Sequence, residues 1–150
     1  TKLPTPSFEK IDINEIIVES VDVFRPRAKN IAIKMDLAEN LPRINADSSL
    51  LSQVIQNLLQ NAYEASERGP IIVETGKSGN GIFFAISDKG EGIPSEMLDK
   101  IFKPYFSTKS GGIGIGMAVV KKIIEAHSGK IQIQSRQGKG TRIIVQIPKF

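Results

Sequence analysis

Apolar residues recur with two different periods along this chain of 150 residues. Helical spacing, with apolar residues three or four positions apart, predicts helices over residues 14–30, 47–67 and 114–127. We expect Pro26 to kink the first helix or to begin its last turn, and residues 67–70 to end the second. The second helix has the clearest pattern, because Asp47 is a good N-cap before a long apolar stripe: Leu50, Leu51, Val54, Ile55, Leu58, Leu59 and Ala62.

Alternating apolar and polar positions predict strands over residues 31–37, 71–75, 81–87, 130–135 and 141–147. Residues 8–13 fit a short edge strand, 41–45 a loop and 94–101 a short helix. Glycine-containing loops at 76–81 and 137–140 predict two hairpins. Helices early and in the middle of the chain, with strands paired through hairpins, predict an α+β fold: a two-layer α/β sandwich with a mixed sheet and helices on one face.

Composition bounds the class of protein. The length fits a single domain, residues 8–150, after a Pro-containing linker end at residues 1–7. The start lacks both Met and an apolar leader, which suggests a fragment or processed chain, and no apolar run is long enough to span a membrane. The absence of Cys fits the cytosol. A net charge of +4 with scattered basic residues favours a solvated surface over nucleic-acid binding.

Two asparagines four residues apart lie on one face of the second predicted helix. Asn57 and Asn61 share that face, and Gln53 extends the row by another turn. One interpretation is a solvated face whose amides bond to nearby backbone. The other is a site where amide oxygens bind a hard cation beside phosphates, because Mg²⁺ takes oxygen ligands and keeps phosphate oxygens among them.

Asp88 follows the apolar run 82–86 and precedes Gly90 and Gly92. Such an Asp-x-Gly sequence fits an ordinary turn. A carboxylate at a strand end also accepts an exocyclic amino proton of adenine, and glycine, which lacks Cβ, lets the backbone approach the base.

A glycine-rich stretch at residues 111–116 precedes the third predicted helix, which continues from Met117. Free N–H groups at a helix start make an anion site, and glycines permit close approach. Thr108 and Lys109, just before this stretch, carry groups suited to phosphate oxygens, although exposed loop residues look the same. The segment 102–113 has the length and glycine content of a lid that closes on a ligand.

In this order the motifs resemble the ATP-binding catalytic domain of sensor histidine kinases, of the Bergerat-type fold shared with type II topoisomerases and the Hsp90 and MutL families. The resemblance spans most of residues 47–147. It is carried by Gln53-x-x-x-Asn57-Leu-Leu-x-Asn61-Ala-x-x-Ala65, Asp88-x-Gly90-x-Gly92-Ile-Pro, Ile101-Phe-x-Pro-Tyr-Phe-Ser-Thr-Lys109, Gly112-x-Gly114-Ile-Gly116 and Gly138-x-Gly140-Thr141.

The resemblance implies a role for each matching position. Asn57 and Asn61 correspond to the Mg²⁺ and phosphate contacts, and with Lys109 they are the expected catalytic residues. Asp88 corresponds to the adenine acceptor, and Phe102 and Phe106 to lid anchors. The expected nucleotide-binding set also includes Ala65, Gly90, Gly92, Ile93, Ile101, Thr108, Gly112, Ile113, Gly114, Ile115, Gly116, Met117 and Thr141. Many relatives carry Thr or Ser at the position of Ile113, so phosphate contact there must come from backbone.

Position 57 separates the members of this superfamily. ATP-hydrolysing relatives carry a Glu general base there, whereas Asn57 cannot take a proton. A neutral histidine needs no such base. The resemblance therefore implies transfer of the ATP γ-phosphoryl group to a histidine. An ATP-driven clamp, with Glu64 as the base, and a nucleotide-free interaction module are the alternatives.

The only histidine, His127, stands at a predicted helix end, where a capping and packing role is expected. The resemblance therefore places the acceptor on a separate dimerising helical domain, with relay to a response-regulator aspartate, and makes the isolated domain a monomer without direct membrane contact. Whether the parent kinase is membrane-anchored stays open. Three lid aromatics are expected to dock on that helical domain: Phe102, Tyr105 and Phe106.

Overall fold

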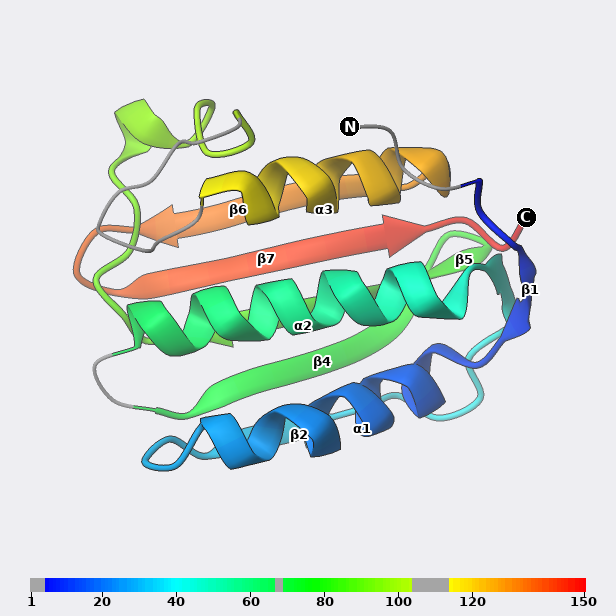
Figure 1. Ribbon diagram of the computed structural model, residues 1–150, viewed down its shortest axis with the longest axis horizontal. Helices are drawn as coiled ribbons and strands as arrows, with labels where there is room; N and C mark the ends of the chain where they lie inside the picture. Colours follow the sequence, from blue (N-terminus) through cyan, green and yellow to red (C-terminus); the bar gives the residue numbers. More distant parts are fainter. Residues whose placement is uncertain (1–4, 67–68, 104–113) are drawn as a thin grey trace.

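The computed structural model describes residues 5–66, 69–103 and 114–150. Its main sheet has five strands in the order β2-β4-β5-β7-β6 (Figure 1). β2 runs parallel to β4, and every other neighbouring pair is antiparallel, so the sheet is mixed. The strands are β2 (Ile33–Asp36), β4 (Ile71–Ser78), β5 (Gly81–Asp88), β6 (Lys130–Arg136) and β7 (Gly140–Ile147).

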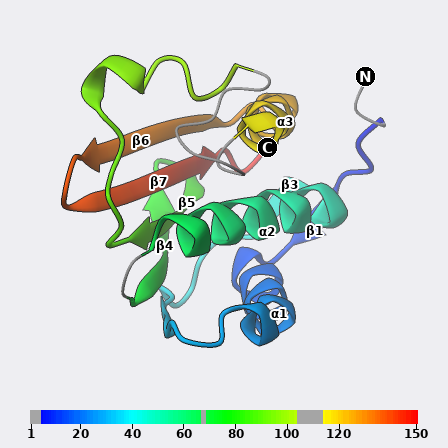
Figure 2. The same cartoon turned by 60° about the vertical axis from the view of Figure 1, so that its left-hand side comes forward.

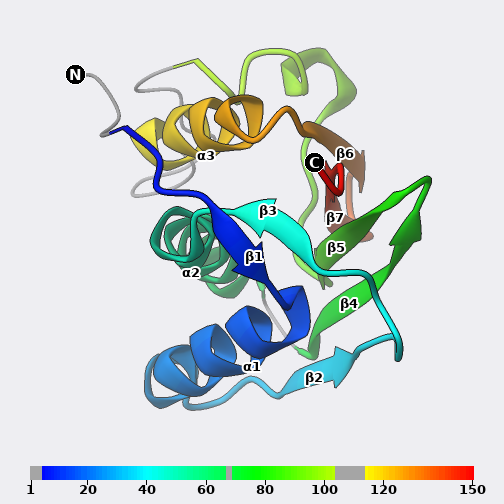
Figure 3. The ribbon, with the colours of Figure 1, turned by 90° about the vertical axis from the view of Figure 1, so that its right-hand side faces the viewer.

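The α-helices of the described residues lie side by side on one face of this sheet. They are α1 (Ile13–Phe24), α2 (Ser48–Ala65) and α3 (Gly114–Ala126), and α2 lies between the other two (Figures 2 and 3). The apolar core fills the space between the helices and the sheet. This confirms the predicted two-layer α+β sandwich. Within the described ranges, no helix combines the length and apolar character needed to cross a membrane.

The central helix α2 forms for the reasons that its sequence suggests. Asp47 is the N-cap, and its Oδ1 accepts the backbone N–H of Leu50 at 3.0 Å. All seven residues of the predicted apolar stripe are buried. Each large aliphatic side chain contributes roughly 1.5–3 kcal/mol when buried, so packing outweighs the helix's many polar residues. At the other end the hydroxyl of Ser66 donates to the carbonyl of Ala62 at 2.6 Å.

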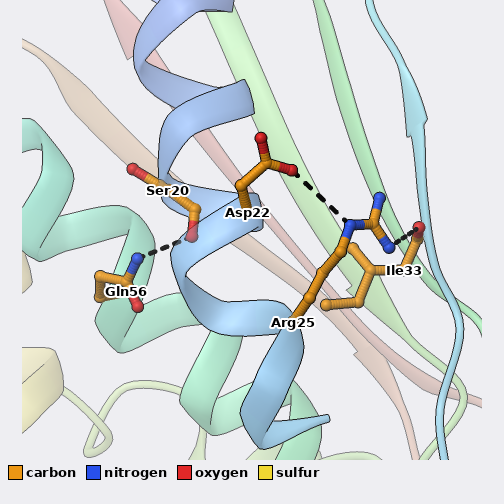
Figure 4. Close-up of polar contacts among 5 residues, drawn as sticks. All are labelled: Ser20, Asp22, Arg25, Ile33 and Gln56. Atoms are coloured by element: carbon orange, nitrogen blue, oxygen red, sulfur yellow. Dashed lines mark hydrogen bonds and ion pairs between the residues drawn. The ribbon is translucent and has the colours of Figure 1, made fainter. Parts of the chain in front are cut away.

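Helix α1 is shorter than predicted, because its α-helical part ends at Phe24 and Pro26 lies in a 3₁₀ turn, Arg25–Arg27. Pro26 thus begins the last turn. Figure 4 shows how α1 is attached on two sides. Gln56 on α2 donates its amide N–H to the carbonyl of Ser20 at 2.8 Å. Arg25 donates to the carbonyl of Ile33 at 3.3 Å and pairs with Asp22 at 3.8 Å.

The prediction for residues 41–45 was wrong, because β3 (Ile44–Ala46) begins there. It pairs antiparallel with β1 (Glu9–Ile11) in a separate two-stranded sheet. The predicted edge strand at 8–13 therefore exists but does not join the main sheet. Three residues are too few to show alternation, and the partner that stabilises β3 comes from the start of the chain.

Two further expectations need correction. Residues 94–101 contain only a 3₁₀ turn, Ser95–Met97, and not a helix. Of these residues only Ile101 is fully buried, so no apolar stripe holds an α-helix in place. The loop expected at 76–81 is much shorter, since β4 and β5 continue up to a turn at residues 79–80. Gly76 pairs with Phe83 in the sheet, and a Cβ at position 76 would collide with the Phe83 ring.

Candidate nucleotide-binding site

One side chain in the polar row on α2 has incomplete hydrogen bonding within the described residues. Asn57 and Asn61 are partly buried, whereas Gln53 is exposed. The Nδ2 atom of Asn61 is buried and has no hydrogen-bond partner among the described residues. A buried amide without a partner costs about 1–3 kcal/mol, so such a group commonly marks a place where a ligand or water completes the site.

The first turn of α3 lies against this row. A methyl group added at Gly116 would be 4.0 Å from the side-chain amide of Asn57. The next residue, Met117, is fully buried and anchors the helix in the core. The N-terminal N–H groups of α3 lack partners within the helix and carry its positive partial charge. An anion held at this helix start would therefore lie beside the amide row of α2.

Asp88 ends β5 and begins a tight turn. Its Oδ1 accepts the backbone N–H of Gly90 at 2.8 Å. A side chain at position 90 would collide with the carbonyl of Ala65, the last residue of α2. Glycine at 90 therefore allows the Asp88 turn to pack against the end of the helix that carries Asn57 and Asn61.

The segment after Asp88 is attached to the β6–β7 hairpin. Gly92 has φ +75°, a conformation that favours glycine. The N–H of Ile93 donates to Ser135 Oγ at 2.7 Å, and the N–H of Gly138 donates to the carbonyl of Glu91 at 2.7 Å. The turn that carries Asp88 is thus held between α2 on one side and the hairpin on the other.

Thr141, one of the predicted nucleotide-binding residues, lies next to Asp88. The two residues are register partners on neighbouring strands, and Ser135 is the partner of Thr141 on the next strand. Ser135 was missed. The sequence indicated it only indirectly. The alternation of β6, with apolar Ile131 and Ile133, predicts a third apolar residue at position 135, where a serine stands instead.

Only part of the predicted lid falls in the described ranges. Ile101 is fully buried, and Lys121 of α3 places its Nζ 5.3 Å from the centre of the Phe102 ring. Gly114 and Ile115 belong to the backbone of α3. The remaining predicted contacts lie outside the described residues: Phe106, Thr108, Lys109, Gly112 and Ile113.

His127 lies far from this site, beside the N-cap of α2. It is buried, its Nδ1 is 2.8 Å from the carbonyl of Ile123, and its Nε2 accepts the N–H of Asp47 at 3.0 Å. Phe8 packs edge-on against its ring, with the ring centres 5.1 Å apart. The expected packing role is confirmed.

These features define an α/β domain with a candidate nucleotide site between α2, α3 and the Asp88 turn. Residues 46–150 match the family model described as histidine kinase-, DNA gyrase B- and HSP90-like ATPase. The chain belongs to this family.

The relatives and solved structures agree with this assignment. The chain is 39% identical over 145 residues to the sensor histidine kinase ZraS of Escherichia coli (strain K12), covering 95% of this chain and 31% of that protein. It is 33% identical to the alginate biosynthesis sensor protein KinB of Pseudomonas aeruginosa, covering 91% and 24%. The chain thus spans about a third or less of these relatives.

Among solved structures, the catalytic domain of histidine kinase ThkA aligns with a TM-score of 0.86 at 35% identity, covering 95% of this chain and 96% of that one. Full-length ShkA in complex with AMPPNP aligns with a TM-score of 0.87 at 25% identity, covering 98% and 32%. The predicted fold class is therefore confirmed by overall geometry as well as by element order.

Proposed function

We propose that this chain binds ATP with Mg²⁺ and donates the γ-phosphoryl group to a histidine on a separate dimerisation domain. The observation that carries the proposal is the buried Nδ2 of Asn61, which has no hydrogen-bond partner among the described residues and shares a helix face with Asn57, the residue next to the first turn of α3. An amide offers both a carbonyl oxygen for a metal and N–H groups for a phosphate oxygen. The donor set therefore fits both ATP and Mg²⁺.

Each part of the site has a role in this proposal. Asn57 and Asn61 ligate Mg²⁺ and contact phosphates, and the start of α3 receives the negatively charged groups. Asp88 accepts an exocyclic N–H of adenine. Phosphoryl transfer depends mostly on positioning and charge neutralisation, which such a site supplies without a general base.

The acceptor histidine belongs elsewhere in this proposal. His127 is the only histidine of the chain, and both of its ring nitrogens are within hydrogen-bond distance of backbone groups. A buried imidazole with these contacts cannot approach a γ-phosphate at the other end of α2. Transfer to a histidine on the dimerisation domain and then to a response-regulator aspartate is the expected sequence.

Calorimetric titration of ADP and of AMPPNP, each with and without Mg²⁺, tests the proposal. We expect binding by the parent chain that weakens without Mg²⁺ and weakens strongly in Asp88→Asn. Radiolabel transfer from ATP to a separately supplied acceptor-histidine domain tests the second half. Absence of nucleotide binding would refute the proposal. Steady-state ATP hydrolysis that Glu64→Gln abolishes would favour the ATPase alternative instead.

A further inference from the structure

Ser135 occupies an inward-facing position at the end of the apolar core. Ser135, Thr141 and Asp88 form one cross-strand row over β6, β7 and β5. Ile86, two residues before Asp88 on β5, and Ile143, two residues after Thr141 on β7, are buried in the core. Because side chains alternate along a strand, the three polar residues project from the same sheet face as those isoleucines. The row therefore lies on the helix side, in the candidate site.

Every hydrogen-bonding capacity of the Ser135 hydroxyl is used within the protein. Its Oγ accepts the N–H of Ile93 at 2.7 Å, lies 2.8 Å from Thr141 Oγ1 and donates to the carbonyl of Gly140 at 3.2 Å. A hydroxyl has one proton and two acceptor lone pairs. The carbonyl of Gly140 only accepts, so it takes the Ser135 proton, and Ile93 takes one lone pair. In this arrangement the remaining lone pair of Ser135 accepts the proton of Thr141, which is one of the two directions that the 2.8 Å contact allows.

This arrangement fixes what Thr141 presents to the site. With its proton directed to Ser135, Thr141 Oγ1 faces its surroundings as an acceptor. Side chains directly opposite on neighbouring strands have Cβ atoms about 4.5–5.5 Å apart, so this acceptor lies next to the Asp88 carboxylate. Two neighbouring acceptors can each bind one N–H of an exocyclic amino group. They repel a carbonyl oxygen, which has no proton to donate.

We propose that Ser135 is a positioning residue that holds the Thr141 hydroxyl as an acceptor, so that the pocket prefers adenine over guanine. Adenine carries an amino group where guanine carries a carbonyl oxygen. The inference rests on the proposed nucleotide-binding function and adds a residue that sets base specificity. Ser135 also holds the Ile93 backbone, so its loss affects both the pocket wall and the Thr141 proton.

The test is a double-mutant cycle on base preference. Affinities for ADP and for GDP are measured by calorimetry for the parent, Ser135→Ala, Thr141→Val and the double variant. Ser87→Ala is the matched control, because Ser87 precedes Asp88 on β5 and its side chain projects from the opposite sheet face. The readout is the ratio of the GDP to the ADP dissociation constant, which a general loss of stability does not change.

We expect Ser135→Ala to reduce this ratio about three- to tenfold, the usual effect of one hydrogen bond. Thr141→Val is expected to reduce it by at least as much, and Ser135→Ala to add nothing in the Thr141→Val background. The control is expected to keep the parent ratio. An unchanged ratio in Ser135→Ala, or fully additive effects, would overturn the inference while ADP binding by the parent leaves the proposed function intact. A parent that binds neither nucleotide would overturn both.

Discussion

An aspartate turn lies at each end of α2, and the two ends differ in how their polar groups are used. At each end an aspartate accepts a backbone N–H two or three residues ahead: Asp47 from Leu50 at 3.0 Å, and Asp88 from Gly90 at 2.8 Å. Asp47 caps the start of the helix, whereas the Asp88 turn packs against Ala65 at its end. Local turn chemistry therefore does not distinguish a structural carboxylate from one that binds a ligand.

The two aspartates differ in the polar groups that surround them. At the N-terminal end, both oxygens of Asp47 accept backbone N–H groups, and both ring nitrogens of His127 have backbone partners. At the C-terminal end, the Nδ2 atom of Asn61 is buried with no hydrogen-bond partner among the described residues. A polar cluster complete within the protein stabilises the fold, whereas an incomplete one indicates a ligand.

The largest effect is expected from Asp88→Asn. The amide keeps an oxygen for the Gly90 N–H but places an N–H group where an acceptor is needed. Losing a hydrogen bond to a charged group costs about 1.5–3 kcal/mol, so ADP affinity falls roughly 10- to 100-fold. Calorimetry measures this loss, and the Asp36→Asn variant, at an exposed residue of β2, serves as the control. Equal ADP affinity in Asp88→Asn and the parent would remove the adenine assignment.

Asp47→Ala should show the opposite profile. Removing an N-cap lowers the free energy of unfolding by about 0.5–2 kcal/mol, and the N–H of Ser7 also loses its acceptor. ADP affinity is expected to stay at the parent value. Urea denaturation measures the free energy of unfolding, and calorimetry measures the ADP affinity. Asp22→Ala, which removes only an exposed ion pair, is the control. A large loss of ADP affinity would mean that the two helix ends are coupled.

Asn61→Ala is expected to separate binding from stability. Without nucleotide, the free energy of unfolding should stay constant or rise by less than about 1 kcal/mol. The substitution removes a buried Nδ2 atom that has no partner among the described residues, and Ala favours helix. The Mg²⁺ dependence of AMPPNP binding should disappear. Urea denaturation and calorimetry give the two values, with exposed Gln53→Ala as control. A clear loss of stability without nucleotide would show that the amide has a structural partner.

The smallest effect is a pH dependence at the N-terminal end. Burial by itself raises the pKa of Asp47, but N–H groups from Ser7, Leu50 and Ser49, with His127 nearby, outweigh it and lower the pKa below its ordinary value of 3.8. The folded state thus favours the charged form. The resulting stability is fully present above pH 3.8 and is lost as the pH falls through the lower pKa of the folded state.

Urea denaturation of the parent and of Asp47→Asn, at pH 6 and at about pH 3, checks this sign. Asn also caps helices, so the variant should differ little in geometry. We expect the difference in unfolding free energy between the two proteins to shrink on acidification. A difference that grows as the pH falls would contradict the assigned direction.

The sequence predicted well where a pattern is long or a motif is local. The apolar stripe of α2 and its Asp47 cap were both found, as was the turn from Asp88 to Gly90, because the apolar spacing and the capping and turn residues are local features of the sequence. It failed at residues 44–46 and 94–101. The first is stabilised by a distant strand, and the second lacks the buried face that a helix needs.

The residues of the candidate site also fall into two groups: those that the sequence identified and one that it did not. Asn57, Asn61 and Asp88 could be named from spacing and resemblance, because residue type carries their chemistry. Ser135 could not, because its importance comes from the Ile93 N–H and the Thr141 hydroxyl, which belong to other segments. The local sequence around a serine in a strand does not indicate such hydrogen-bond partners.

What the sequence by itself determined is the set of elements with strong periodicity, and the chemical groups available for a nucleotide. These follow from local spacing and from the nature of each side chain. Only the tertiary structure decided which of those groups meet: the start of α3 beside Asn57, Gly90 against Ala65, and Ser135 beside Thr141. The physical reason is that hydrogen bonds and close packing depend on distances of a few ångströms, which the folding of remote segments sets.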